Sequence, residues 1–140
     1  MKRLLLIISI LALVLLPMGC VDVEGILQGV ADNIIQQATG TYTIKVCSNT
    51  TGLNFTGEYS VYFCEWNSDT EKIDYSKDSY SVEGQVPKEY SFEGMTAGGL
   101  FQKQTGNETL LKVEIWKDEV LIDSANTTDP WGAVMVAAGP

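Results

Sequence analysis

The strongest constraint on the fold is a change of hydrophobic period at Gly40. After this residue apolar and polar side chains alternate, as in Tyr42, Ile44 and Val46, and a period of two is that of a β-strand with one buried face. Similar runs recur down the chain between turn-forming residues: TYTIKV, EYSVYF, DSYSVEG, KEYSFEG, LLKVEIW, EVLID and GAVMVA. Short, unequal strands favour two packed sheets. We therefore predict an all-β fold for residues 41–140, an antiparallel β-sandwich of about seven strands.

The start of the chain resembles an export signal. Lys2 and Arg3 precede an apolar run that ends at Pro17, and the run is shorter than the roughly 20 residues of a membrane-spanning helix. We expect residues 1–19 to be a signal peptide. The pair Gly19-Cys20 resembles the lipobox of lipoproteins, which implies lipid modification of Cys20. A plain cleaved signal and an uncleaved anchor are the alternatives.

The next segment has a helical pattern. Apolar side chains recur every three or four residues between Val21 and Thr39, and Gly40 ends the pattern. Gly25 and Gly29 weaken a helix by about 1 kcal/mol each relative to alanine. We expect a short helical or flexible tether over residues 20–40, attached to lipid at its start. The alternative is an amphipathic segment that rests on the membrane or on the domain.

Composition excludes several classes of function. The formal net charge is −9, and it becomes more negative if Lys2 and Arg3 are removed with a signal peptide. This charge disfavours nucleic acid and anionic bilayers as partners. The chain has no histidine, and no arginine beyond Arg3, so it lacks the commonest general base and the bidentate phosphate ligand. We expect no enzyme activity and no cofactor.

One acidic stretch resembles a cation site in composition only. The sequence EWNSDTEKIDYSKD, residues 65–78, has five carboxylates, and such oxygens are ligands for Ca²⁺. Their spacing matches no known calcium loop. We interpret the stretch as a solvated acidic loop and expect no metal site.

Four of the six asparagines lie in Asn-x-Thr triplets: Asn49, Asn54, Asn107 and Asn126. This excess predicts N-glycosylation and hence an extracytoplasmic surface, although turns also enrich asparagine and threonine together. Combined with a lipobox-like signal, the triplets indicate an archaeal protein.

Cys47 and Cys64 remain once Cys20 is assigned to the anchor. A pair of cysteines in an exported chain predicts a disulfide, which here would contribute about 3 kcal/mol. A simple hairpin between residues 42–47 and 58–64 would not place the two residues opposite each other. Two free thiols are the alternative.

The order of motifs after residue 42 resembles small membrane-attached immunoglobulin-like (Ig-like) domains such as the MmpS-type proteins. The resemblance rests on TYTIKV, VEGQVPKEYSFEG and the final LLKVEIWKDEVLIDSANTTDPWGAVMVA, and Lys88 and Glu119 depart from the family pattern. It implies an Ig-like sandwich and a role as an accessory to lipid or siderophore exporters.

These features predict a lipid-anchored protein on the extracytoplasmic side of the cell membrane, acting as an accessory or binding subunit of an envelope complex. Its partner would be an envelope protein or a lipid-like ligand. We expect the partner face around Met95, Leu100 and Phe101, unless the last two are core residues. A surface ligand-binding or adhesion module and a secreted hydrolase are the alternatives. Three tryptophans, Trp66, Trp116 and Trp131, either form a glycan or hydrophobic ligand platform or pack the sandwich edge.

Overall fold

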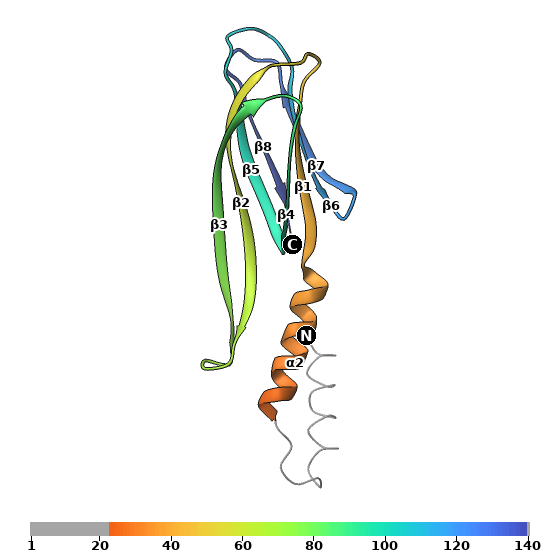
Figure 1. Cartoon of the computed structure of the whole chain (residues 1–140), viewed down its shortest axis with the longest axis vertical. Helices are drawn as coiled ribbons and strands as arrows, with labels where there is room; N and C mark the ends of the chain where they lie inside the picture. The colour runs from red at the N-terminus through yellow and green to blue at the C-terminus, as the bar shows by residue number, and fades with distance from the viewer. Residues whose placement is uncertain (1–22, 140) are drawn as a thin grey trace.

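The computed structural model describes residues 23–139 (Figure 1). Within this range one helix, α2 (Val23–Ala38), precedes eight strands. They are β1 (Gly40–Cys47), β2 (Asn54–Asn67), β3 (Lys72–Gln85), β4 (Lys88–Gly94), β5 (Thr96–Lys103), β6 (Leu111–Lys117), β7 (Val120–Thr127) and β8 (Ala133–Ala138).

The strands form two four-stranded antiparallel sheets with the orders β4-β1-β6-β7 and β3-β2-β5-β8. Only the β2–β3 and β6–β7 connections are hairpins, and every other connection crosses from one sheet to the other. The inward side chains form one core, with Ile44, Phe101 and Val113 fully buried between the sheets. The predicted all-β sandwich is confirmed. The strand β5 was not delimited from the sequence because its glycines interrupt the alternation.

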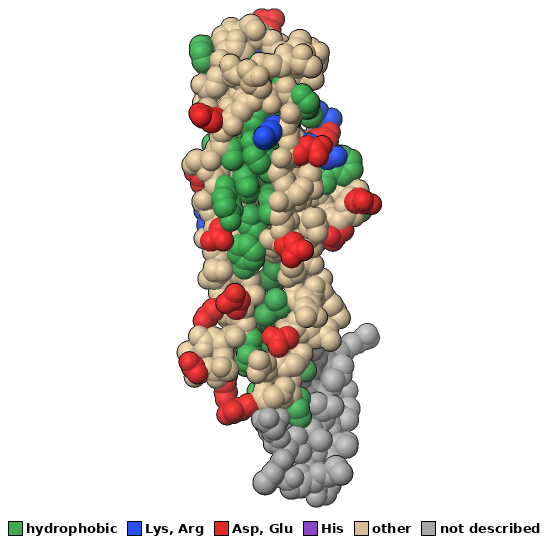
Figure 2. Space-filling view, in the orientation of Figure 1, with side chains coloured by type: hydrophobic (Ala, Val, Ile, Leu, Met, Phe, Trp, Pro, Cys, Tyr) green, Lys and Arg blue, Asp and Glu red, His purple; other side chains and the backbone are tan. Residues whose placement is uncertain are grey.

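Aromatic side chains close the open side of the sandwich between the edge strands β3 and β4. The Tyr59 ring stacks on those of Tyr80 and Phe92, with ring centroids 5.0 Å apart in both pairs. Figure 2 shows an apolar strip along this side, continuing down between the hairpin and the helix. Offset aromatic contacts of this kind add to the free energy of burial, so the strip completes the core.

The β2–β3 hairpin is much longer than predicted. Both strands have 14 residues, and the hairpin extends beyond the other sheet, beside α2 (Figure 1). The interpretation of residues 65–78 as a loop is therefore wrong, since only the short turn between Asn67 and Lys72 is irregular. Asn67 Oδ1 orders this turn by accepting hydrogen bonds from the backbone amides of Asp69 and Thr70. Pairing with β2 overrides the polar composition of β3.

The expected helix is present as α2, and it is attached to the sandwich. Ala31 is buried, Ile35 is half-buried, and α2 packs against β2. No helix among residues 23–139 is both long and apolar enough to cross a membrane. The predicted signal peptide and Cys20 lie outside the described residues.

The junction between α2 and β1 is held by the β6–β7 turn. Lys117 Nζ donates to the Ala38 carbonyl oxygen at 3.1 Å, where a cation also complements the helix dipole. The Thr41 amide donates to Asp118 Oδ1 at 2.9 Å, and the Asp118 amide donates to the Thr41 carbonyl at 2.9 Å. A Cβ at Gly40 would lie 2.5 Å from Lys117 Cε. We call these contacts the junction clamp.

The predicted Cys47–Cys64 disulfide is wrong, because both cysteines are free. Cys47 ends β1 in one sheet, and Cys64 lies in β2 of the other sheet, beyond the middle of the strand. Since β2 starts at the end of the sandwich where β1 finishes, about ten residues of extended strand, roughly 30 Å, separate the two positions along the molecule. A disulfide needs Cα atoms within about 7 Å.

Candidate functional site

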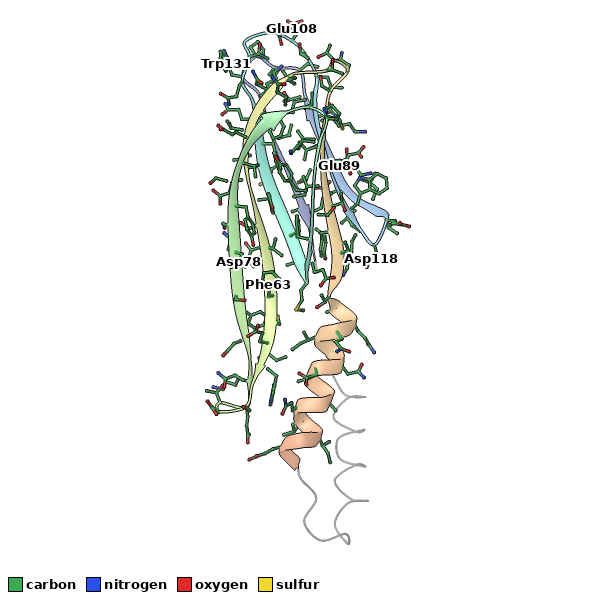
Figure 3. All side chains as sticks on the ribbon, viewed as in Figure 1. Phe63, Asp78, Glu89, Glu108, Asp118 and Trp131 are labelled. Carbon is green, nitrogen blue, oxygen red and sulfur yellow. The ribbon has the colours of Figure 1, made fainter. Side chains whose placement is uncertain are left out.

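A hollow of about 640 Å³ lies on the outer face of the β4-β1-β6-β7 sheet. Alternate residues of each strand point outward, so β1 and β4 contribute alternate side chains to it, β6 contributes Trp116, and the β6–β7 turn adds two carboxylates. The lining residues are Thr41, Thr43, Lys45, Glu89, Ser91, Trp116, Asp118 and Glu119. Figure 3 shows Glu89 and Asp118 on this side of the sandwich. We call this region the Trp116 hollow.

Polar contacts fix the tryptophan that walls the hollow. Trp116 Nε1 donates to Glu114 Oε2 at 3.0 Å, and Lys45 Nζ lies 4.8 Å from the ring centroid. Lys45 Nζ also forms an ion pair with Glu89 Oε1 at 3.7 Å. Lys112 Nζ forms an ion pair with Glu114 Oε1 at 2.5 Å, and the hydrogen bond from this ammonium lowers the pKa of the Glu114 carboxyl. The indole is therefore positioned before any ligand binds.

The rest of the lining offers hydroxyl and carboxylate groups. Thr43 Oγ1 and Ser91 Oγ are hydrogen-bonded at 3.1 Å, and Asp118 is engaged by the Thr41 amide. Glu119 makes no ion pair or side-chain hydrogen bond with other described residues. Within residues 23–139 no group of His, Cys, Asp and Glu side chains is arranged to hold a metal. The arrangement is suited to binding a polar ligand beside an aromatic ring.

The three tryptophans do not form one platform. Trp66 lies by α2, with Leu27 lining the same small cleft, and Trp131 is exposed at the opposite end of the molecule, as Figure 3 shows. Only Trp116 lines the hollow. The site was not predicted: the alternation in β1 could have placed Thr41, Thr43 and Lys45 on one outward face, but the pairing of β1 with β6 is needed to place them beside Trp116.

The predicted partner face is wrong as a single surface. Phe101 is fully buried in the core, and Leu100 points the other way with 53% of its surface exposed. Met95 is half-buried at the corner between β4 and β5, where its carbonyl accepts the Tyr42 hydroxyl. Leu100 instead lies opposite Met135 on β8, which is 70% exposed. Successive residues of a strand face opposite sides of the sheet, so Leu100 and Phe101 cannot share a face.

All four Asn-x-Thr triplets lie at the end of the sandwich farthest from α2. β1 leads away from the helix to the loop that holds Asn49 and to the start of β2 at Asn54. β5 leads to the loop with Asn107, and β7 ends beside Asn126. All four asparagine side chains are exposed. The opposite end, with the turns at residues 68–71 and 118–119, carries acidic side chains in place of such triplets.

A buried lysine organises this distal end. Lys103 is fully buried, and its Nζ donates to the carbonyl oxygens of Asn107, Thr109 and Thr128 at 2.7–2.9 Å. All three donors of the ammonium are thus satisfied, as burial of a charge requires. Gln104 adds a hydrogen bond from its side chain to Thr56. These contacts tie together three of the four triplets, which the sequence alone did not indicate.

No protein-family model matches the chain, and it has no significant match among curated proteins.

Proposed function

We propose that the chain is a lipid-anchored extracytoplasmic protein whose β-sandwich is a non-catalytic binding module. The observation that carries this proposal is that the helix and the four triplets lie at opposite ends of the sandwich. The helix that follows Cys20 leaves one end of the sandwich, and the four Asn-x-Thr triplets lie at the other end. Attachment at Cys20 would direct the triplets away from the membrane, where glycans have room.

The junction clamp supports a role for α2 as a stalk. Its hydrogen bonds fix the C-terminal turn of the helix to the β6–β7 turn, and α2 also packs on the β2–β3 hairpin. A lipid at Cys20 would then hold the sandwich at a defined height above the membrane. Two acyl or ether chains are needed for stable attachment.

The Ig-like identity of the sandwich belongs to the same proposal. Its support is the pair of antiparallel sheets joined by connections that cross between them at both ends. β5 and β8 are neighbours in one sheet although the β6–β7 hairpin, in the other sheet, separates them in sequence.

A role as an accessory subunit of an envelope complex is the second candidate. It is favoured by the exposed apolar pair Leu100 and Met135 on the outer face of the β3-β2-β5-β8 sheet, because exposed apolar side chains that adjoin one another are typical of protein contacts. The Trp116 hollow favours ligand binding.

The anchor is tested by expressing the whole chain and its Cys20→Ser variant in a host that processes lipoproteins. We expect the wild type in the detergent phase of a phase-partition assay and the variant in the medium or the aqueous phase. Equal membrane retention of both proteins would show that the segment is an uncleaved anchor. Release of both would show that it is a plain signal peptide.

A further inference from the structure

We propose that the Trp116 hollow binds a neutral saccharide chain. The inference rests on the proposed function, because it names the ligand class of that binding module. Its basis is the side-chain chemistry of the hollow: one indole, three hydroxyls, and carboxylates beside a single ammonium.

The lining matches the two kinds of surface on a sugar ring. The C–H face of a pyranose is apolar and packs on an aromatic ring, and its hydroxyls pair with hydroxyl and carboxylate groups. The hollow places Thr43 and Ser91 on neighbouring strands beside Trp116. Glu119 supplies acceptor oxygens with no partner among the described residues.

A lipid chain fits the same hollow poorly. Among the described residues that line the hollow, Trp116 is the only one with an apolar side chain, so an acyl chain would cover Glu89 and Asp118 without offering them hydrogen bonds. Removing such carboxylates from water without compensation is costly.

The charged side chains of the hollow repel acidic ligands, and they offer few free carboxylates to basic ones. Three carboxylates and one ammonium line the hollow, so a phosphate or an acidic polysaccharide would be repelled. Two of the carboxylates already have partners, since Glu89 pairs with Lys45 and Asp118 accepts the Thr41 amide. The lysine also occupies the cation position over the indole, so a sugar ring that packs on this face must displace the flexible Lys45 side chain. A neutral ligand leaves the Asp118 contact intact and brings no charge that the carboxylates would repel.

The position of the hollow suits a polymer at a cell surface. The hollow opens on the side of the sandwich, towards the end that carries α2. Asn126 is on the same sheet, but it pairs with Lys112, whereas Leu121 pairs with Trp116. A glycan at Asn126 would therefore be attached about five residues, roughly 17 Å, farther along β7, and would leave the hollow open.

The test is affinity electrophoresis of the full-length protein in polyoxyethylene detergent micelles, which avoids detergents with sugar headgroups. Native gels would contain dextran, mannan or hydroxyethyl cellulose as neutral probes, and polylysine would be tested as a basic peptide. We expect at least one neutral polysaccharide to retard the wild type. Trp116→Ala should lower the association constant about tenfold or more, because the stacking surface is lost.

A second variant and a matched control separate binding from folding. Ser91→Gln fills the hollow from an exposed position on the edge strand β4 and leaves the indole in place, so it should weaken retardation to a similar extent. Trp131→Ala removes an exposed tryptophan at the far end of the molecule and should bind like the wild type. Circular dichroism and thermal unfolding would verify the fold of each variant.

Three results would overturn the inference: no retardation by any neutral polysaccharide, retardation that persists in both Trp116→Ala and Ser91→Gln, or binding to polylysine alone. None of them bears on the anchor, because the assay uses purified protein. Conversely, loss of the Cys20 anchor in the partition assay would leave saccharide binding to the purified chain unaffected.

Discussion

The two ends of the sandwich are each held by a lysine that donates to backbone carbonyls, but in different surroundings. At the distal end Lys103 is fully buried and satisfies three carbonyl oxygens. At the end with α2, Lys117 is partly buried, and its Nζ donates to one carbonyl among the described residues, that of Ala38, and lies 5.4 Å from the Tyr42 ring centroid. The first lysine fixes loops within the domain, and the second joins a separate element to it.

The difference indicates where each end can tolerate change. Loss of Lys103 would leave three part-buried carbonyl oxygens without their donor at once, and an unsatisfied acceptor costs more free energy than a typical hydrogen bond contributes. Loss of the Lys117 contact would free one carbonyl at a helix end that water can reach. We therefore expect the distal end to unfold with the domain and the helix to detach from it locally.

The largest effect is expected for Lys103→Met, which keeps the apolar stem and removes the ammonium. Three carbonyl oxygens lose their donor, so the free energy of unfolding should fall by about 3 kcal/mol or more. Urea denaturation measures this change, and Lys88→Met, at an exposed position of β4, is the control. A fall of less than about 0.5 kcal/mol, as for an ordinary surface substitution, would show that Lys103 does not organise the distal loops.

A smaller effect is expected for Gly40→Ala. The new Cβ would lie 2.5 Å from Lys117 Cε and 2.8 Å from Asp118 Oδ2, so both side chains must move and the junction clamp opens. We expect a loss of about 1 kcal/mol in stability, together with faster hydrogen exchange in α2 but not in β1.

Gly29→Ala is the matched control for this substitution. Apart from the backbone of the helix itself, no atom lies within 4 Å of the position that the new Cβ would take, and alanine favours a helix by about 1 kcal/mol over glycine. Exchange in α2 should therefore become slower. Unchanged exchange in α2 of the Gly40→Ala variant would mean that α2 is held by contacts other than the clamp.

The free thiols provide a third comparison of the two ends. Burial raises the pKa of both Cys47 and Cys64, so less thiolate is present at pH 8 than in an ordinary cysteine, and both should react slowly with a thiol reagent in the native state. In a Cys20→Ser chain denatured without reductant, both thiols should titrate. If neither thiol titrated, the two cysteines would be joined in a disulfide after all.

The smallest effect on stability is expected for Asn→Gln at each triplet. The four side chains are exposed, so each unfolding free energy should change by less than about 0.5 kcal/mol. Each variant made in the native host should lose the mass of one glycan. An unchanged mass for all four would show that the distal end is not glycosylated.

Sequence patterns were sufficient for the layers of the fold but not for its long-range pairings. The alternation in residues 41–46 and 110–116 indicated strands, and the spacing of Ile26, Val30 and Ile34 indicated a helix. The length of β3 was missed because its 14 residues are mostly polar and are held by pairing with β2. Likewise, nothing local to Lys103 indicates that its partners lie in two separate loops.

The candidate site was predictable only in part. Trp116 was noted as one of three tryptophans, but its neighbours Thr43 and Ser91 come from strands that are distant in sequence. The disulfide failed for the same reason, since period-two patterns do not specify which sheet a strand joins.

The most direct test of the central claim is peptide mass spectrometry of the protein purified from its native membranes. We predict an N-terminal peptide that begins at Cys20 and carries lipid, together with glycans on Asn49, Asn54, Asn107 and Asn126. A mature chain without lipid at Cys20 and with four unmodified asparagines would contradict this claim.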